Sequence, residues 1–319
     1  MDRAQFLRLA AGALAGVLLA PARAMQPSSS ASKAAMNNQI AHFSGAMPKR
    51  PIPSSREMLP VIGCGTYVGF DVPMGSPRYQ GLPAVLAALY AAGGSVLDSS
   101  PMYGRAEEVT GALLAAAGSR AQAFVATKVW TSGREAGIRQ MEESMRRLQC
   151  SQVDLMQIHN LLDWRTHLKT LRDWKAQGRI RYIGVTHYTA SAYAELEAVM
   201  RAEALDFIQI NYAINDREAE RRILPLARER GMAVLVNTPF GGGNLLRRLH
   251  ERPLPPWAAE IGAASWAQVL LKFVLSHPAT TCAIPGTARA EHMAQNAEAA
   301  LGPLPDQAFW ARHADAIGI

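Results

Sequence analysis

The chain has 319 residues, of which 49% are hydrophobic and 18% charged, which is enough for one large α/β domain with a full hydrophobic core. The net charge is +7 and its lysines and arginines are dispersed, so we expect no nucleic-acid partner. The three cysteines, Cys64, Cys150 and Cys282, contain no CxxC pair. Their spacing fits neither a zinc site nor a disulfide framework, so we expect small buried side chains and no bound metal.

Residues 1–24 are arranged like a signal peptide. Arg3 and Arg8 precede an apolar run over residues 9–20, and small residues allow cleavage after Ala24. The run is too short to span a bilayer, so we expect no stable membrane insertion after processing. Residues 3–8 resemble a twin-arginine signal whose second arginine is replaced by Ala4, which predicts a periplasmic or exported protein. A retained apolar anchor and a cytoplasmic location are the alternatives.

Residues 25–57 are rich in Ser, Ala, Asn and Pro and have no sustained apolar period. This composition predicts a flexible linker. We therefore predict that the folded domain covers residues 58–319.

From residue 58 onward, short apolar runs alternate with longer helical patterns. Near-continuous apolar runs are typical of parallel strands buried on both faces. The predicted strands are 61–65, 95–98, 124–128, 155–159, 183–186, 207–211, 233–237 and 281–284. The predicted helices are 82–92, 106–117, 134–149, 164–177, 190–204, 217–230, 266–277 and 290–300.

Eight such units predict an α/β fold, a single-domain (β/α)8 TIM barrel. The interruption at 244–262 is proline-rich and predicts a loop or a short helix over the barrel mouth. A doubly wound sheet is the alternative, and it usually has a GxGxxG motif after its first strand. Residues 63–68, GCGTYV, do not match that motif.

Polar residues close three successive predicted strands. Asp98, Lys128 and His159 end them, and Tyr103 lies in the loop after Asp98. In a TIM barrel these strand ends form the active site. A tyrosine hydroxyl has a pKa of about 10, and a nearby ammonium group lowers it, so we expect Lys128 to tune Tyr103 and Asp98 to keep Lys128 charged. With His159 holding a substrate oxygen, such a site suits protonation of a carbonyl as it receives hydride.

Seven segments together resemble the aldo-keto reductase family over residues 58–300. They are GCGTY (63–67), LDSSPMYG (97–104), ATKVW (126–130), VDLMQIHN (153–160), IGVTHY (183–188), FIQINY (207–212) and IPGTARAEHMAQN (284–296). The resemblance implies a (β/α)8 barrel, an extended nicotinamide cofactor, usually NADPH, and no metal. It makes Tyr103 the general acid, with Asp98 and Lys128 as its tuning pair and His159 as the residue that orients the carbonyl.

The resemblance also implies a cofactor site. It places the nicotinamide carboxamide near Thr186, His187 and Gln209, and the adenosine phosphate at 284–296, where a helix begins. The full expected set is Gly65, Thr66, Thr186, His187, Gln209, Asn237, Phe240, Pro285, Gly286, Thr287, Arg289, His292 and Asn296.

Three features depart from the family pattern, at four positions. Asn237 stands where an aromatic residue often stacks on the nicotinamide, and Phe240 is a candidate replacement. His187 stands where the family often has Asn. Gly286 and His292 replace a lysine and an arginine of many members, so NADPH is the expected cofactor and NADH remains possible.

Phe70, Trp130 and Trp164 follow predicted strands and are expected to line an apolar substrate pocket, with packing at the rim as the alternative. The predicted function is NAD(P)H-dependent reduction of a small-molecule carbonyl substrate. A nicotinamide-nucleotide-binding redox-sensing or regulatory module with little turnover is the alternative. A metal-dependent hydrolase needs clustered ligands such as His-x-His on an early strand, a pattern that this sequence lacks.

Overall fold

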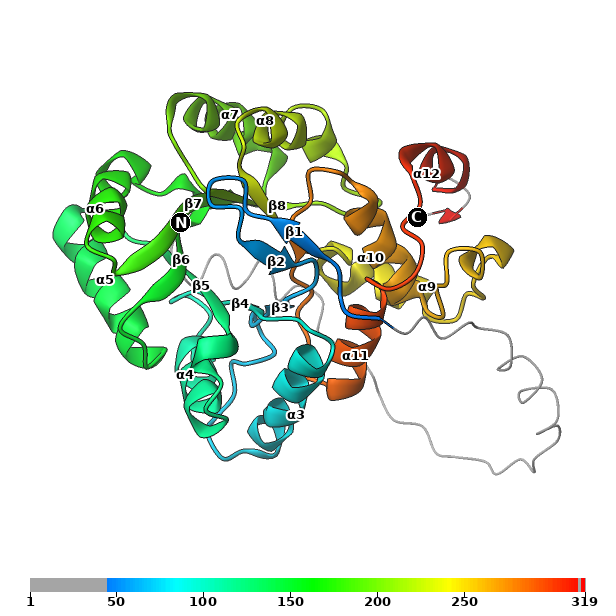
Figure 1. Cartoon of the computed structure of the whole chain (residues 1–319), viewed down its shortest axis with the longest axis horizontal. Coiled ribbons are helices and arrows are strands. Elements are labelled where there is room, and N and C mark those ends of the chain that lie inside the picture. The colour runs from blue at the N-terminus through cyan, green and yellow to red at the C-terminus, as the bar shows by residue number, and fades with distance from the viewer. Residues whose placement is uncertain (1–44, 315–316, 319) are drawn as a thin grey trace, which may run out of the picture. The chain divides into compact units, whose positions relative to one another are not determined.

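Eight parallel strands form one sheet in the order β10-β9-β8-β7-β6-β5-β4-β3 (Figure 1). Isolated parallel bridges, Ile62 to Ala283 and Gly65 to Gly286, join its two ends, so the sheet is nearly closed. The computed structural model describes residues 45–314 and 317–318, and the predicted signal peptide lies outside them. The strands are β3 Cys64–Gly65, β4 Val96–Asp98, β5 Phe124–Val129, β6 Val153–Ile158, β7 Ile180–His187, β8 Phe207–Asn211, β9 Ala233–Asn237 and β10 Cys282–Ala283.

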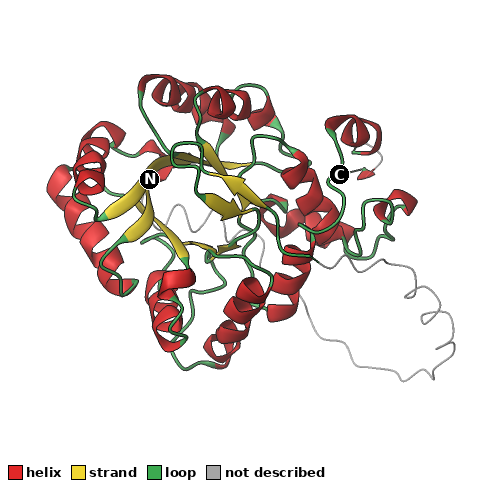
Figure 2. Cartoon of the chain, viewed as in Figure 1, coloured by secondary structure: helices red, strands yellow, loops and turns green. Residues whose placement is uncertain are grey.

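Helices surround the strands, which confirms the predicted barrel architecture (Figure 2). Two predicted helices begin later than expected, because their first turns are the 3₁₀ segments Ala190–Ala192 and Glu218–Glu220. The helices are α3 Pro77–Ala91, α4 Ala106–Ala116, α5 Arg134–Arg147, α6 Trp164–Ala176, α7 Tyr193–Ala202, α8 Ile223–Glu229, α9 Asn244–Leu249, α10 Trp266–Ser276, α11 Ala290–Glu298 and α12 Gln307–His313. The interruption at 244–262 contains α9 and a 3₁₀ turn, Pro256–Ala258.

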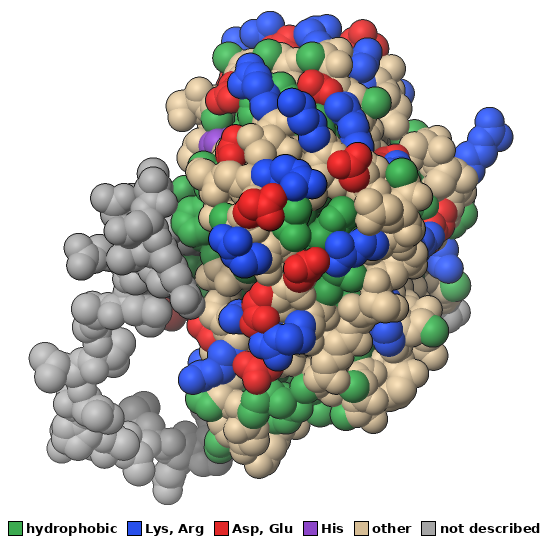
Figure 3. All heavy atoms as spheres, turned by 90° about the vertical axis from the view of Figure 1, so that its left-hand side faces the viewer, with side chains coloured by type: hydrophobic (Ala, Val, Ile, Leu, Met, Phe, Trp, Pro, Cys, Tyr) green, Lys and Arg blue, Asp and Glu red, His purple; other side chains and the backbone are tan. Residues whose placement is uncertain are grey.

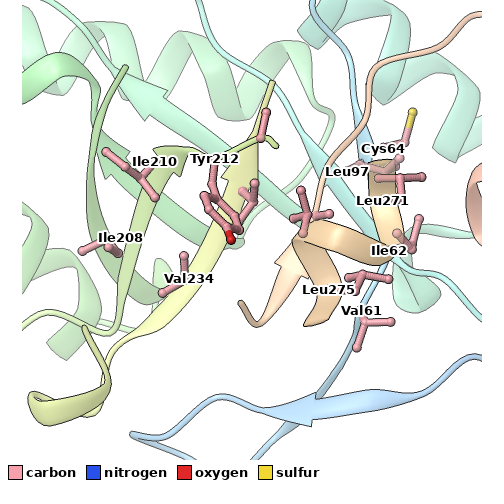
Figure 4. Close-up of a cluster of buried hydrophobic side chains, with 14 of the residues drawn as sticks. Val61, Ile62, Cys64, Leu97, Ile208, Ile210, Tyr212, Val234, Leu271 and Leu275 are labelled. Atoms are coloured by element: carbon pink, nitrogen blue, oxygen red, sulfur yellow. The ribbon is translucent and has the colours of Figure 1, made fainter. Parts of the chain in front are cut away.

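Alternation along each strand separates two hydrophobic layers. One cluster joins Phe124, Leu155 and Tyr182 from the neighbouring strands β5, β6 and β7, and we assign it to the barrel interior. The intervening residues pack in a larger cluster that includes helix residues. Figure 4 shows part of this layer, with Ile208 and Val234 on the strands and Leu271 on α10. Every second residue of each strand therefore faces inward, and this alternation continues to the carboxyl ends of the strands.

The folded part of the chain begins earlier than predicted. Strand β1 (Lys49–Pro51) lies inside the predicted linker and pairs antiparallel with β2 (Met58–Pro60). Fully buried Ile52 packs in the interior cluster with Phe124, and Arg50 donates a hydrogen bond of 2.6 Å to the carbonyl of Leu275. The predicted boundary at residue 58 is therefore wrong, because two three-residue strands are too short to produce a recognisable apolar period.

Helix α12 was not predicted. Its Trp310 is fully buried, with its ring 5.4 Å from Phe273 on α10 and 6.0 Å from Trp257. On the side of the molecule that carries α5 and α6, Figure 3 shows cationic and acidic side chains intermixed. On α5, for example, Arg146 pairs with Glu143 at 2.6 Å. No helix in the described part of the chain is long and apolar enough to cross a membrane.

Candidate active site

A buried ion pair lies at the carboxyl ends of β4 and β5. Nζ of Lys128 donates hydrogen bonds of 2.9 and 2.8 Å to the two carboxylate oxygens of Asp98, and one of 2.7 Å to the carbonyl of Ser99. Asp98 pairs with Ala126 across the two strands. Because side chains alternate along a strand, Lys128 lies two residues later on the same inward face as Ala126. Lys128 is 1% exposed and Asp98 2%. Burial lowers the pKa of Lys128, and the charge of Asp98 opposes that shift.

Two glutamine amides extend this pair into a network. Nε2 of Gln209 lies 3.2 Å from Oδ2 of Asp98, and Nε2 of Gln157 lies 2.8 Å from Oε1 of Gln209 and 3.4 Å from Oδ1 of Asp98. Gln157 was not among the predicted site residues, although strand alternation places it on the same face as His159. Gln209 was expected at the nicotinamide, but the structure engages its amide with Asp98 and Gln157.

Tyr103 is half-buried beside this network, in the loop after β4. Nζ of Lys128 lies 5.1 Å from the centre of its ring. Burial raises the pKa of Tyr103 well above its usual value, and the negative charge of Asp98 adds to the shift. The expected lowering by Lys128 is therefore not the net direction, because burial dominates the pKa of Tyr103. The phenol keeps its proton at neutral pH.

His159 follows β6, with its ring centre 6.2 Å from that of Tyr103 and the two planes at 84°. Burial lowers the pKa of His159 well below its usual value, and the charge of Lys128 adds to this. The imidazole is therefore neutral at neutral pH, and one of its nitrogens carries a hydrogen. The chain turns sharply after it, with Asn160 at a φ of 54°. The amide N–H of Asn160 donates a hydrogen bond of 3.3 Å to the hydroxyl oxygen of Thr186.

Two aromatic rings flank the tyrosine and the histidine. The ring centre of Tyr67 lies 5.0 Å from that of Tyr103, and that of Trp130 lies 6.4 Å from that of His159. Trp130 was a predicted pocket residue. Tyr67 was missed as one, although it ends the GCGTY segment. The structure therefore places one aromatic ring beside the predicted proton donor and another beside the histidine.

The other two predicted pocket residues, Phe70 and Trp164, differ in burial. Phe70 is 0% exposed and packs in the hydrophobic core, so the prediction that it lines a pocket is wrong. Trp164 is half-buried at the start of α6, and the guanidinium of Arg165 lies 4.3 Å from the centre of its ring. Loop side chains follow no periodic pattern, so the sequence did not reveal which way these rings point.

Acceptor atoms at the barrel mouth fit a nicotinamide carboxamide. Oδ1 of Asn160 and Oδ1 of Asn237 are buried without a hydrogen-bond partner. Such oxygens call for an N–H donor, and a carboxamide carries two. At the end of β7, the ring of His187 stacks on that of Tyr188. Its Nδ1 accepts a hydrogen bond of 3.0 Å from the amide N–H of Tyr188. Neutral His187 therefore carries its hydrogen on Nε2.

Two expected cofactor residues are occupied within the protein. Thr66 is fully buried, and its hydroxyl donates a hydrogen bond of 3.0 Å to the carbonyl oxygen of Asp98. Phe240 is buried in the hydrophobic core, so the prediction that it replaces the stacking aromatic is not supported. Asn237 is thus left without that substitute.

The segment before α11 fits a phosphate. Gly65 and Gly286 pair across the barrel seam, and a Cβ on Gly65 would lie 2.9 Å from the carbonyl of Ile284. Helix α11 begins at Ala290, where free amide N–H groups and the helix dipole favour an anion. Of the other expected residues, three lie before the helix: Pro285 is buried, Thr287 half-buried and Arg289 exposed. Two lie within α11, where His292 is exposed and Asn296 buried.

No group of three or more His, Cys, Asp or Glu side chains among residues 45–314 and 317–318 is placed to hold a metal ion.

Comparisons with known proteins agree on one family. The model of the Aldo/keto reductase family matches residues 61–313. The methylglyoxal reductase YeaE of Escherichia coli (strain K12) is 31% identical over 247 residues, which cover 75% of this chain and 84% of that protein. An aldo-keto reductase from Klebsiella pneumoniae, solved with NADPH, superposes with a TM-score of 0.71 at 26% identity, covering 85% of this chain and 95% of the other. The thermostable aldo-keto reductase Tm1743, solved with the inhibitor epalrestat, gives a TM-score of 0.70 at 26% identity, with coverages of 85% and 100%.

Proposed function

The chain belongs to the aldo/keto reductase family of NAD(P)H-dependent oxidoreductases, and from that premise we propose that it reduces an aldehyde or ketone to an alcohol with Tyr103 as the proton donor. The observation that carries this proposal is the placement of the Tyr103 phenol and the His159 imidazole beside a buried Lys128–Asp98 pair. Burial raises the pKa of Tyr103 and lowers that of His159, which favours the protonated phenol and the neutral imidazole. Such a set can give a proton to a carbonyl oxygen without first taking one from solvent.

Each residue has a part in this mechanism. The bound cofactor supplies the hydride. His159 donates a hydrogen bond to the carbonyl oxygen and orients it, and the hydroxyl of Tyr103 gives that oxygen its proton. The ammonium of Lys128 then stabilises the phenolate that remains, while Asp98 fixes the ammonium in place.

We propose NADPH as the cofactor, with NADH as the alternative. The unpartnered oxygens of Asn160 and Asn237 support a carboxamide site, and the start of α11 with Arg289 supports a phosphate site. The complex of the Klebsiella pneumoniae relative with NADPH supports the same choice.

We propose a small aldehyde, such as a 2-oxoaldehyde, as the substrate. The rings of Tyr67 and Trp130 lie beside Tyr103 and His159, and this aromatic surface supports a compact, partly apolar substrate. The Escherichia coli relative is named a methylglyoxal reductase, which supports this class.

Two measurements test the proposed function. Quenching of tryptophan fluorescence during titration with NADPH and NADH gives both affinities, and a panel of aldehydes that includes methylglyoxal then gives the rates. We expect tighter binding of NADPH and consumption of NADPH with a small aldehyde. Tight binding with no turnover of any carbonyl would contradict the proposal and favour the regulatory alternative.

We also propose export through a twin-arginine-like route, based on residues 1–24, which lie outside the described residues. This route would carry a folded protein with its cofactor already bound. Uncleaved full-length protein in the cytoplasmic fraction would contradict it.

A further inference from the structure

A buried hydroxyl contacts the imidazole of the active site from the side of β4. Oγ of Ser100 lies 3.3 Å from Nδ1 of His159, and Ser100 is 0% exposed. It lies two residues beyond Asp98, the last residue of β4, in the loop that leads to Tyr103. The carbonyl of Ser100 accepts a hydrogen bond of 3.0 Å from the amide N–H of Tyr103, so the hydroxyl stands between the ion pair and the tyrosine in the chain.

The direction of this hydrogen bond follows from the partners of the hydroxyl. Oγ of Ser100 also lies 3.5 Å from the backbone nitrogen of Met102. In that contact the amide N–H is the donor and the hydroxyl oxygen is the acceptor. The hydroxyl still has its own hydrogen, and a buried hydrogen-bond donor requires an acceptor. Among the described residues, Nδ1 of His159 is the acceptor within hydrogen-bond distance of that hydroxyl.

An acceptor nitrogen cannot carry a hydrogen, and this selects the tautomer. Neutral imidazole holds one hydrogen, so if Nδ1 accepts from Ser100, Nε2 is the N–H donor. The two nitrogens are separated by a ring carbon, so the Nε2–H bond points away from Ser100. With the other tautomer, a lone pair on Nε2 would meet the lone pairs of a carbonyl oxygen.

We propose that Ser100 is a positioning residue that holds His159 as the Nε2–H tautomer, and thereby makes His159 a donor to the substrate carbonyl. This inference rests on the proposed function for its catalytic consequence. Its structural part, the choice of tautomer, does not depend on turnover and can be measured in the resting protein.

The test combines spectroscopy with kinetics on the full chain. The ¹⁵N shifts of the two ring nitrogens of His159 are read from protein labelled at histidine, with the signal assigned by its loss in His159→Gln. We expect the wild type to show a hydrogen on Nε2 and none on Nδ1, and Ser100→Ala to shift the population toward the Nδ1–H form. We expect kcat for the aldehyde to fall about tenfold in Ser100→Ala, the equivalent of one lost hydrogen bond, while the Kd for NADPH stays the same.

Two variants separate positioning from a general loss of structure. Ser100→Thr keeps the hydroxyl and is expected to restore both the tautomer and most of kcat. Thr170→Val removes a buried hydroxyl without a partner on α6 and is expected to change neither. A wild-type Nδ1–H tautomer, or an unchanged tautomer and kcat in Ser100→Ala, would overturn the inference. A wild type with the Nε2–H tautomer but no carbonyl turnover would leave the tautomer assignment standing and contradict the proposed function instead.

Discussion

Replacing Asp98 by Asn tests whether the buried ion pair is held by mutual neutralisation. In the wild type, Lys128 is 1% exposed and donates two hydrogen bonds to the carboxylate of Asp98. The change removes the charge of that carboxylate and leaves the lysine ammonium buried without a counter-ion. Breaking a buried pair by removing one partner costs about 3–5 kcal/mol, so we expect the free energy of unfolding at neutral pH to fall by that amount. Urea unfolding followed by tryptophan fluorescence measures it.

The pH dependence of this variant has a definite sign. Burial lowers the pKa of Lys128, and loss of Asp98 removes the charge that opposes this shift. The unfolded chain then binds more protons than the folded one at mildly alkaline pH, so the stability of Asp98→Asn rises relative to wild type as the pH increases. The double variant with Lys128→Met is expected to be more stable than Asp98→Asn alone, because it removes the unpaired charge.

The matched control is an exposed ion pair. Glu143→Gln removes a carboxylate that pairs with Arg146 and Arg147 on the surface of α5, and is expected to leave stability nearly unchanged. If Asp98→Asn stayed within about 1 kcal/mol of wild type at every pH, the reasoning about an unpaired buried charge would fail.

Three further changes test other parts of the structure, each by urea unfolding. Ile52→Ala, fully buried against the barrel interior, is expected to cost about 2–5 kcal/mol, whereas Met58→Ala, half exposed, is expected to cost little; equal effects would contradict the role of the β1–β2 hairpin. Gly111→Ala would put a Cβ 2.2 Å from the carbonyl of Arg147, so we expect a loss of about 1–3 kcal/mol, and a neutral result would refute that contact. Burial lowers the pKa of Lys272 to about 8, so between that value and its usual 10.5 the unfolded chain binds more protons. Wild type should therefore gain about 1 kcal/mol over Lys272→Met from about pH 7.5 to about pH 9, and a flat difference would exclude the shift.

Strand periodicity was sufficient to predict the barrel and the ion pair. Asp98, Lys128 and His159 each continue the inward parity of an apolar run, and such runs are local features of the sequence. Gln157 shares this parity and could have been found by the same reasoning.

Other features depend on tertiary packing and were out of reach. The pKa of Tyr103 depends on how deeply its side chain is buried and on how close the charge of Asp98 lies. The core positions of Phe70 and Phe240 depend on loop directions that no period encodes. The tautomer of His159 depends on a contact between two different strand ends, 59 residues apart in the sequence.

The substitution Tyr103→Phe tests the central claim most directly. It removes the hydroxyl and keeps the ring that contacts Tyr67 and lies near Lys128. We expect kcat for aldehyde reduction to fall by about 10²- to 10⁴-fold, the usual contribution of a general acid, with the Kd for NADPH unchanged by fluorescence titration. A variant that binds NADPH normally and reduces aldehydes at the wild-type rate would contradict the assignment of Tyr103 as the proton donor.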